Sequence, residues 1–164
     1  MSKDFYKQFI LPYAGIIVKI CRAYTDSEED FQDYYQETCL QLWKSRNNFK
    51  GNSKWSTWVY RISLNVSLSL LRKDKKINKN SNELPEISGD LHSEENPFNS
   101  ESLKLLYSAI KKLSEADRAI ILLYLEENSY REIAEITGLS SNNIGVKITR
   151  IKKKLKELLD GKIY

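Results

Sequence analysis

The residues best suited to chemistry lie between positions 47 and 65, in the stretch NNFKGNSKWSTWVYRISLN. It holds two of the three tryptophans of the chain, a phenylalanine and a tyrosine among basic residues, and no acidic residue. Aromatic rings can stack on unpaired bases, at about 1–3 kcal/mol per base, while cationic side chains follow the phosphate backbone. A base extruded from a duplex needs such a pocket to offset the cost of unstacking. The stretch predicts a nucleic-acid surface, although Trp55 lies on an apolar stripe and is equally suited to a hydrophobic core.

A second candidate site lies in SYREIAEITGLSSNNIGVKITRIKKKLKELL. Ser129 and Glu132 match a capping box, Gly138 ends the first helix, and Ser140 or Ser141 begins a longer one. A short capped helix, a turn with glycine and a second helix make the helix-turn-helix pattern, with a basic helical hairpin as the alternative. The outer face of the second helix suits base reading and phosphate contact. Its residues are Asn142, Asn143, Val146, Lys147, Thr149, Arg150 and Lys153.

A third candidate is the acidic run from Asp26 to Glu37, which holds six acidic residues and no basic one. Ser27 can cap a helix here, and the acids after it complement the positive end of the helix dipole. The apolar positions step by three and four, which leaves Asp33, Gln36 and Glu37 largely on the outside.

Charge is strongly segregated, although the net charge is only +4. Residues 44–79 hold ten bases and one acid, residues 83–101 hold six acids and no lysine or arginine, and residues 140–164 hold seven bases and two acids. Each run alone could be a solvated face. Their alternation indicates at least two kinds of partner, one of them nucleic acid.

The elements that must position these residues all read as helices. The first is expected at about residues 3–24, with a bend at Pro12, and the second begins at Ser27. The third starts near Ser53, but its apolar residues fall on two opposite faces of one helical wheel. Because a helix broken near residues 63–65 would give each half a single apolar face, we expect a break there.

The helical periodicity of apolar residues is absent between residues 75 and 99, in a segment rich in Asn, Ser, Glu and Pro. Such a composition cannot bury enough apolar area to offset its ordering entropy. We therefore predict an all-α protein of two small helical domains, residues 1–75 and 100–164, joined by a flexible acidic linker at residues 76–99. The second domain contains the helix-turn-helix.

Several classes of protein are disfavoured by composition. Cys21 and Cys39 are not spaced as CxxC, which favours a reduced, intracellular protein over a disulfide scaffold. A single histidine, His92, leaves little for a Cys/His metal site, so we expect no metal and no cofactor. Lys7 and Pro12 interrupt the N-terminal apolar run, which is too short to be a membrane span and does not resemble a signal peptide.

The motifs also resemble a known family. DYYQETCLQLW, FKGNSKWSTWVYRISLN and LRK look like region 2 of the extracytoplasmic-function sigma factors, small bacterial promoter-recognition subunits of RNA polymerase. LSEADRAIILLYLEENSYREIAEITGLSSNNIGVKITRIKKKL is similar to their region 4. The resemblance implies a cytoplasmic alternative sigma factor that binds core polymerase, recognises minus-35 and minus-10 promoter elements and promotes melting, without enzymatic chemistry.

The resemblance also implies roles for individual residues. The family's D-x-x-Q-E helix docks on the clamp helices of the largest polymerase subunit, which implicates Asp33, Gln36 and Glu37. The flap of the second subunit and an anti-sigma factor are further implied partners. Asn65 corresponds to the base of a pocket for a flipped non-template base. The implied minus-10 set is Lys50, Trp58, Tyr60, Arg61 and Asn65. The second helix of the helix-turn-helix would read the minus-35 element.

The chain departs from the family pattern at three positions. Ser69 stands where many relatives have Asp, and Gly145 and Val146 stand where many have a base followed by Ser. Direct minus-35 contacts therefore shift toward the asparagines, Lys147 and Arg150. Two rival functions remain open: a self-sufficient dimeric helix-turn-helix regulator, and a nucleic-acid-processing enzyme, for which no nucleophile or phosphate-loop motif is present.

Overall fold

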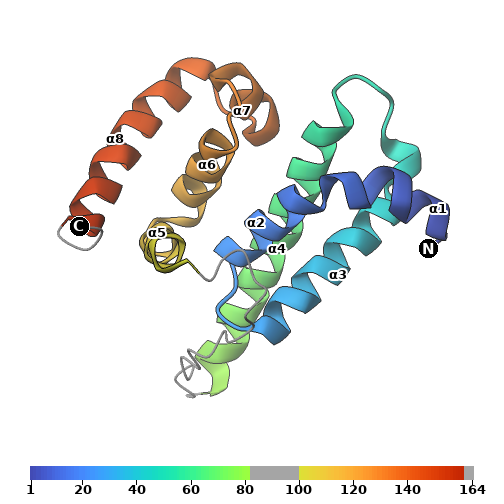
Figure 1. Cartoon of the computed structure of the whole chain (residues 1–164), viewed down its shortest axis with the longest axis horizontal. Coiled ribbons are helices and arrows are strands. Elements are labelled where there is room, and N and C mark those ends of the chain that lie inside the picture. Colours follow the sequence, from blue (N-terminus) through green and yellow to red (C-terminus); the bar gives the residue numbers. More distant parts are fainter. Residues whose placement is uncertain (82–99, 161–164) are drawn as a thin grey trace. The chain divides into compact units, whose positions relative to one another are not determined.

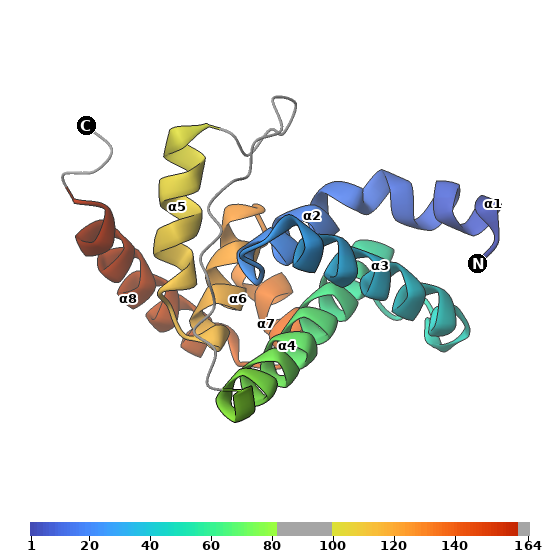
Figure 2. The same cartoon turned by 90° about the horizontal axis from the view of Figure 1, so that it is seen from below.

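The computed structural model describes residues 1–81 and 100–160, and Figures 1 and 2 show its helices from two directions. The chain divides into two compact units, Met1–Gly89 and Asp90–Tyr164. Every regular element in the described ranges is helical, which confirms the predicted all-α class. Most of the predicted linker lies outside the described residues.

The first unit opens with a nearly continuous helical segment of changing pitch. The short α1, Lys3–Phe5, leads into a π-helical turn, Tyr6–Ile10, and a 3₁₀ turn, Leu11–Tyr13, before the regular α2, Ala14–Ala23. Pro12 lies in the 3₁₀ turn, where its missing N–H and its ring disfavour an unbroken α-helix. The predicted first helix is thus present, with its irregularity around Pro12.

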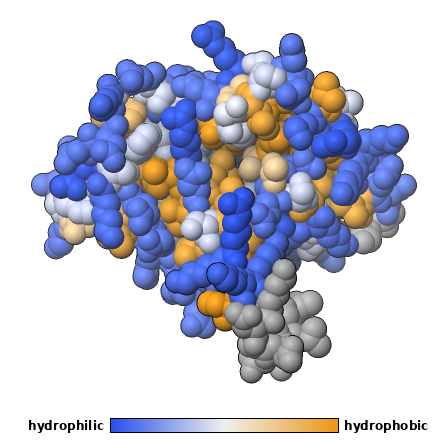
Figure 3. All heavy atoms as spheres, turned by 180° about the vertical axis from the view of Figure 1, so that it is seen from behind, coloured by the Kyte–Doolittle hydropathy of each residue, from blue (hydrophilic) through white to orange (hydrophobic). Residues whose placement is uncertain are grey.

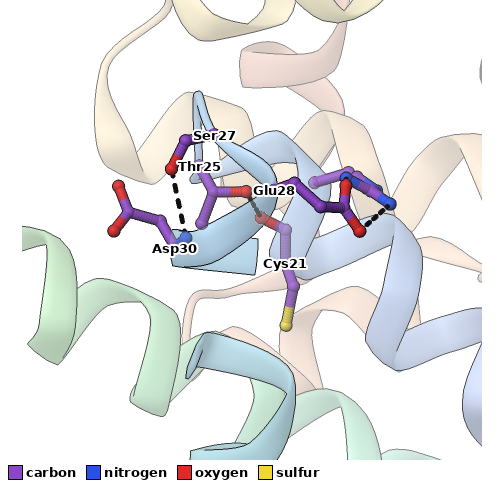
Figure 4. A network of polar contacts seen from close by, with 6 residues as sticks. Cys21, Thr25, Ser27, Glu28 and Asp30 are labelled. Atoms are coloured by element: carbon purple, nitrogen blue, oxygen red, sulfur yellow. Dashed lines mark hydrogen bonds and ion pairs between the residues drawn. The ribbon is translucent and has the colours of Figure 1, made fainter. Parts of the chain in front are cut away.

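A compact polar network joins α2 to α3, Glu28–Lys44 (Figure 4). The Ser27 hydroxyl accepts a hydrogen bond from the Asp30 backbone N–H at 3.1 Å, which confirms Ser27 as the cap of α3. Arg22 donates to both carboxylate oxygens of Glu28, at 2.6 and 3.4 Å, and its guanidinium lies 3.6 Å from the centre of the Phe31 ring. These contacts fix the start of α3 relative to α2.

The last helix of the first unit, α4, runs from Trp55 to Ser81 without interruption, so the predicted break at residues 63–65 is wrong. It packs against both α2 and α3. Consequently both apolar stripes are covered: Val59, Leu64 and Val66 are all buried. A helix that is apolar on two faces needs no break when it has neighbours on both sides. It also extends beyond residue 75, where we placed the domain boundary.

The second unit consists of α5, Glu101–Lys111, α6, Glu115–Leu125, α7, Tyr130–Thr137, and α8, Ser141–Leu159. Each helix begins at a serine whose hydroxyl accepts a backbone N–H from the residue three positions later. Helix α8 packs against each of the other three. The fully buried large side chains of this core are Ile110, Ile120, Ile121, Leu123, Ile133, Ile144, Ile148 and Ile151.

Two kinds of feature are absent from the residues that the structure describes. Among residues 1–81 and 100–160, no helix is long and apolar enough to span a bilayer. In the same ranges, no cluster of three or more His, Cys, Asp and Glu residues could hold a metal ion.

Candidate nucleic-acid interface

Helix α3 has a fixed inner face and an acidic outer face. On the inside, the Tyr34 hydroxyl donates to the Asp74 carboxylate of α4 at 3.0 Å, and burial together with that carboxylate raises the pKa of Tyr34. On the outside, Asp33 and Gln36 are exposed, and the half-buried Glu37 accepts a hydrogen bond from the Gln41 side chain at 2.9 Å. The structure therefore brings the three predicted docking residues together on one side of α3.

Trp55 holds the start of α4 in place. Its indole N–H donates to the Phe9 carbonyl oxygen at 2.7 Å. The indole ring meets Phe5, Phe9 and Phe49 edge-on, with centroids 6.2, 5.5 and 5.1 Å away. Aromatic pairs at such distances are stabilising beyond the area that they bury. Trp55 is therefore a structural residue, as its place on the apolar stripe indicated.

Because α4 is continuous, the predicted minus-10 residues are arranged differently from the prediction. Trp58, Arg61 and Asn65 follow one another at steps of three and four, so they share one face of the helix. Asn65 is exposed and Arg61 half-buried on this face, whereas we expected Asn65 beside a helix break. Lys50 lies in the loop before α4 and is exposed. The site is thus a stripe along one helix face plus an adjacent loop. We call Trp58, Arg61 and Asn65 the α4 stripe.

Tyr60 does not belong to this surface. It lies on the opposite face of α4 and is only 6% exposed, so its ring is not accessible to a base in this structure. Its inclusion among the DNA-contacting residues is therefore corrected: Tyr60 is part of the core. The sequence could not distinguish the two roles, because both faces of α4 carry aromatic residues.

Trp58 lies at the edge between core and surface. It is half-buried, and its ring packs at a tilt against Phe49 with 5.9 Å between centroids. Within the described part of the chain, the buried indole N–H has no hydrogen-bond partner. Phe49 was not among the predicted site residues, although it is the residue that lies against Trp58. Its position in the same aromatic stretch as Trp58 was the feature of the sequence that could have identified it.

The helix-turn-helix is built by α7 and α8. The Ser129 hydroxyl accepts from the Glu132 backbone N–H at 3.1 Å, and the Glu132 carboxylate accepts from the Ser129 backbone N–H at 2.8 Å. This capping box is the one predicted. Gly138 ends α7 at φ 81°, a conformation that glycine adopts without a steric penalty, and Ser140 caps α8.

The residues predicted to read duplex DNA lie on the side of α8 away from its buried stripe, except Lys147, which flanks the stripe. All are exposed except Lys147, which is half-buried. Arg150 reaches within 3.6 Å of the Asp117 carboxylate in α6, and the Thr149 hydroxyl donates to the Gly145 carbonyl at 3.1 Å. The structure thus groups this predicted set on one polar, basic face.

Lys152 lies at the border of this polar, basic face, which we call the reading face of α8. Lys152 donates to the Tyr124 hydroxyl at 2.5 Å, and its ammonium lies 4.2 Å from the centre of that ring. The hydrogen bond raises the pKa of Lys152, which therefore stays cationic. Since it leans back onto α6, Lys152 is a packing residue, whereas Lys153 belongs to the reading face.

Known proteins resemble this chain in both units. The family described as Sigma-70 region 2 matches residues 9–77, and the family described as Sigma-70, region 4 matches residues 103–155. An ECF RNA polymerase sigma-E factor of Haemophilus influenzae is 29% identical over 99% of this chain and 89% of its own length. The chain belongs to the extracytoplasmic-function sigma factors. It is an alternative sigma factor, which directs promoter recognition and transcription initiation.

Further relatives agree with this assignment. The ECF sigma factor SigW of Bacillus subtilis is 25% identical over 96% of the sigma factor described here and 90% of its own length. A solved structure of the sigma factor RpoE in complex with the anti-sigma factor NepR, from Bartonella quintana, shares the fold, with a TM-score of 0.79 and 23% identity over 98% of this chain and 99% of that chain. The region 2 match accounts for the first unit, which a self-sufficient helix-turn-helix regulator would not need.

Proposed function

We propose that this sigma factor uses three separate surfaces in succession. The outer face of α3 docks on the clamp helices of the largest core polymerase subunit through Asp33, Gln36 and Glu37. The outer face of α8 reads the duplex minus-35 element. The α4 stripe, with Lys50, then captures unstacked bases of the minus-10 element. The chain itself performs no covalent chemistry.

The observation that carries this proposal is the separation of buried and exposed faces on α8. Ile144, Ile148 and Ile151 are buried, and the residues predicted to read DNA lie on the other side of the helix, with Lys147 at its edge. Asparagine and arginine present hydrogen-bonding groups that match base edges in the major groove, and lysines pair with phosphates. A helix that ends a helix-turn-helix and exposes such a face is suited to the major groove.

Binding energy is used twice in this mechanism. Duplex reading by α8 places the polymerase on the promoter. Stacking on Trp58 and polar contacts with Arg61 and Asn65 then favour the open state, because these contacts exist only with extruded bases. Both steps stabilise a conformation of DNA, so neither requires a catalytic residue or a cofactor.

Other parts of the proposal concern the partners and the compartment. The named relatives act with RNA polymerase, so we place this sigma factor in the cytoplasm. The flap of the second core subunit is the expected contact of region 4. An anti-sigma factor is a further expected partner, since the similar RpoE structure is a complex with the anti-sigma factor NepR.

Reconstitution tests the proposal directly. The purified chain is mixed with core polymerase and fragments of genomic promoter DNA, and run-off transcripts are measured. We expect a stable complex with core and transcripts from a subset of promoters that share two elements. Failure to bind core, or tight specific duplex binding by the chain alone, would contradict the proposal.

A further inference from the structure

Val146 is an exposed apolar side chain on the reading face of α8. It is 72% exposed, more than any other exposed large hydrophobic residue among those that the structure describes. Hydrophilic residues and hydrophobic patches both reach the face of the molecule seen in Figure 3. The residues three and four positions from Val146 on α8 are Asn142, Asn143, Thr149 and Arg150. Valine also has a lower helix propensity than alanine, so it does not stabilise α8 locally. Its position suggests a role in binding.

Gly145, the residue before Val146, has no side chain that could reach a base. A Cβ atom at Gly145 would lie 3.3 Å from a ring carbon of Tyr130, so a side chain there would require the Tyr130 ring to shift by a few tenths of an ångström. Glycine inside a helix costs about 1 kcal/mol relative to alanine, and the close approach of α7 gives it a structural reason here. Position 145 therefore has no side chain with which to read a base, and Val146 is the adjacent residue that does.

The hydroxyl of Thr149 is also engaged within the helix. It donates to the Gly145 carbonyl at 3.1 Å, so Thr149 offers an approaching partner chiefly its methyl group. Val146 and Thr149 lie three residues apart, which makes them neighbours on one helix face. Together they form a small apolar strip between Asn142 and Arg150.

We propose that, in addition to the contacts expected from the asparagines, Lys147 and Arg150, Val146 contacts the 5-methyl group of a thymine in the minus-35 element. This inference rests on the proposed reading of duplex DNA by α8. In the major groove only thymine presents a methyl group, and apolar side chains are the groups that recognise it. The cations at Lys147, Arg150 and Lys153 surround the apolar strip and match a polyanion, which favours DNA over an apolar protein partner as the occupant.

The test uses holoenzyme reconstituted from core polymerase and the full chain, on a promoter obtained by selection from random duplexes. Each thymine of the minus-35 element is replaced in turn by deoxyuridine, which lacks only the methyl group. We expect one replacement to weaken wild-type binding about fourfold, from the loss of one buried methyl contact. With Val146→Ala the same replacement should have a clearly smaller effect, because the shorter side chain buries less of the methyl group. Ile77→Ala, which removes another exposed apolar side chain outside the second unit, should respond like wild type.

Three outcomes would overturn the inference: no effect of any deoxyuridine, an equal effect in wild type and Val146→Ala, or a selected minus-35 element without an A·T pair. Arg150→Ala and Asn142→Ala separate these failures from failure of the proposed function. If they weaken minus-35 binding while deoxyuridine has no effect, only the thymine contact is wrong. If they too leave binding unchanged, the reading of DNA by α8 is wrong.

Discussion

The α4 stripe and the reading face of α8 each lie on one side of a helix. They differ in how many of their residues also pack in the hydrophobic core. Helix α4 is buried on two sides, and its half-buried Trp58 packs against Phe49 while serving as a candidate base-stacking residue. Helix α8 is buried on one side only, and its reading residues are nearly all exposed. We infer that substitution of Trp58 in the α4 stripe changes both DNA binding and the free energy of unfolding, whereas substitutions in the reading face of α8 change DNA binding alone.

The largest expected effect follows from Trp55, which anchors the start of α4. Trp55→Ala removes three ring contacts and the hydrogen bond to Phe9, and should lower the free energy of unfolding of the first unit by about 2–4 kcal/mol. Chemical denaturation followed by circular dichroism measures the loss. Lys153→Ala, on the exposed face of α8, is the matched control and should change stability by less than about 0.5 kcal/mol. Equal losses of stability in both variants would contradict the structural role of Trp55.

The two buried cysteines of the first unit should make its stability depend on pH. Burial raises the pKa of Cys21 and of Cys39 from 9.0 to about 11. Between these values the unfolded chain loses the thiol protons while the folded chain keeps them, so stability present below pH 9 falls as the pH rises toward 11. The loss should be on the order of 2–3 kcal/mol per thiol. Unfolding of wild type and Cys21→Ala at pH 8 and pH 11 measures it. The variant should show a smaller fall, and an identical fall would refute the assignment.

Substitutions on the outer face of α3 show whether binding and stability are linked throughout the first unit or only in α4. Replacing Asp33 and Glu37 with alanine should weaken core polymerase binding about tenfold or more, because charged docking contacts are lost, and should leave the thermal midpoint unchanged. Fluorescence titration with core measures the affinity. Asp4 and Glu101, two exposed acids outside this face, give the matched double alanine control. Unchanged affinity would refute the docking face.

Asn65→Ala should have the smallest effect, and within α4 it should be the one most specific to promoter preference. Asn65 is exposed on the α4 stripe, so Asn65→Ala should leave stability and core binding intact. The loss of one or two hydrogen bonds to a base should change relative transcription from minus-10 variants by about two- to tenfold. Ser69→Ala, one turn further along α4, serves as the comparison. A wild-type preference order in the Asn65 variant would count against the contact.

The extent to which sequence predicted structure differs between the same two regions. The capping box at Ser129 and Glu132, the end of α7 at Gly138 and the buried stripe of α8 depend on local signals and were predicted correctly. The continuity of α4 depends on neighbours on two sides, which a helical wheel does not reveal. Tyr60 was misplaced for the same reason. The contact of Tyr130 with Gly145 joins two helices and could be seen only in the structure.

The most direct test of the account measures melting separately from duplex binding. Holoenzymes with wild-type, Trp58→Ala, Trp58→Phe and Arg150→Ala chains are bound to one promoter, and permanganate reactivity reports unpaired minus-10 thymines. We predict that Trp58→Ala retains minus-35-dependent binding but loses melting, and that Trp58→Phe restores part of the melting. Arg150→Ala should lose binding but recover transcription on a template opened in advance. Wild-type melting by a correctly folded Trp58→Ala chain would contradict the proposed role of Trp58 in melting.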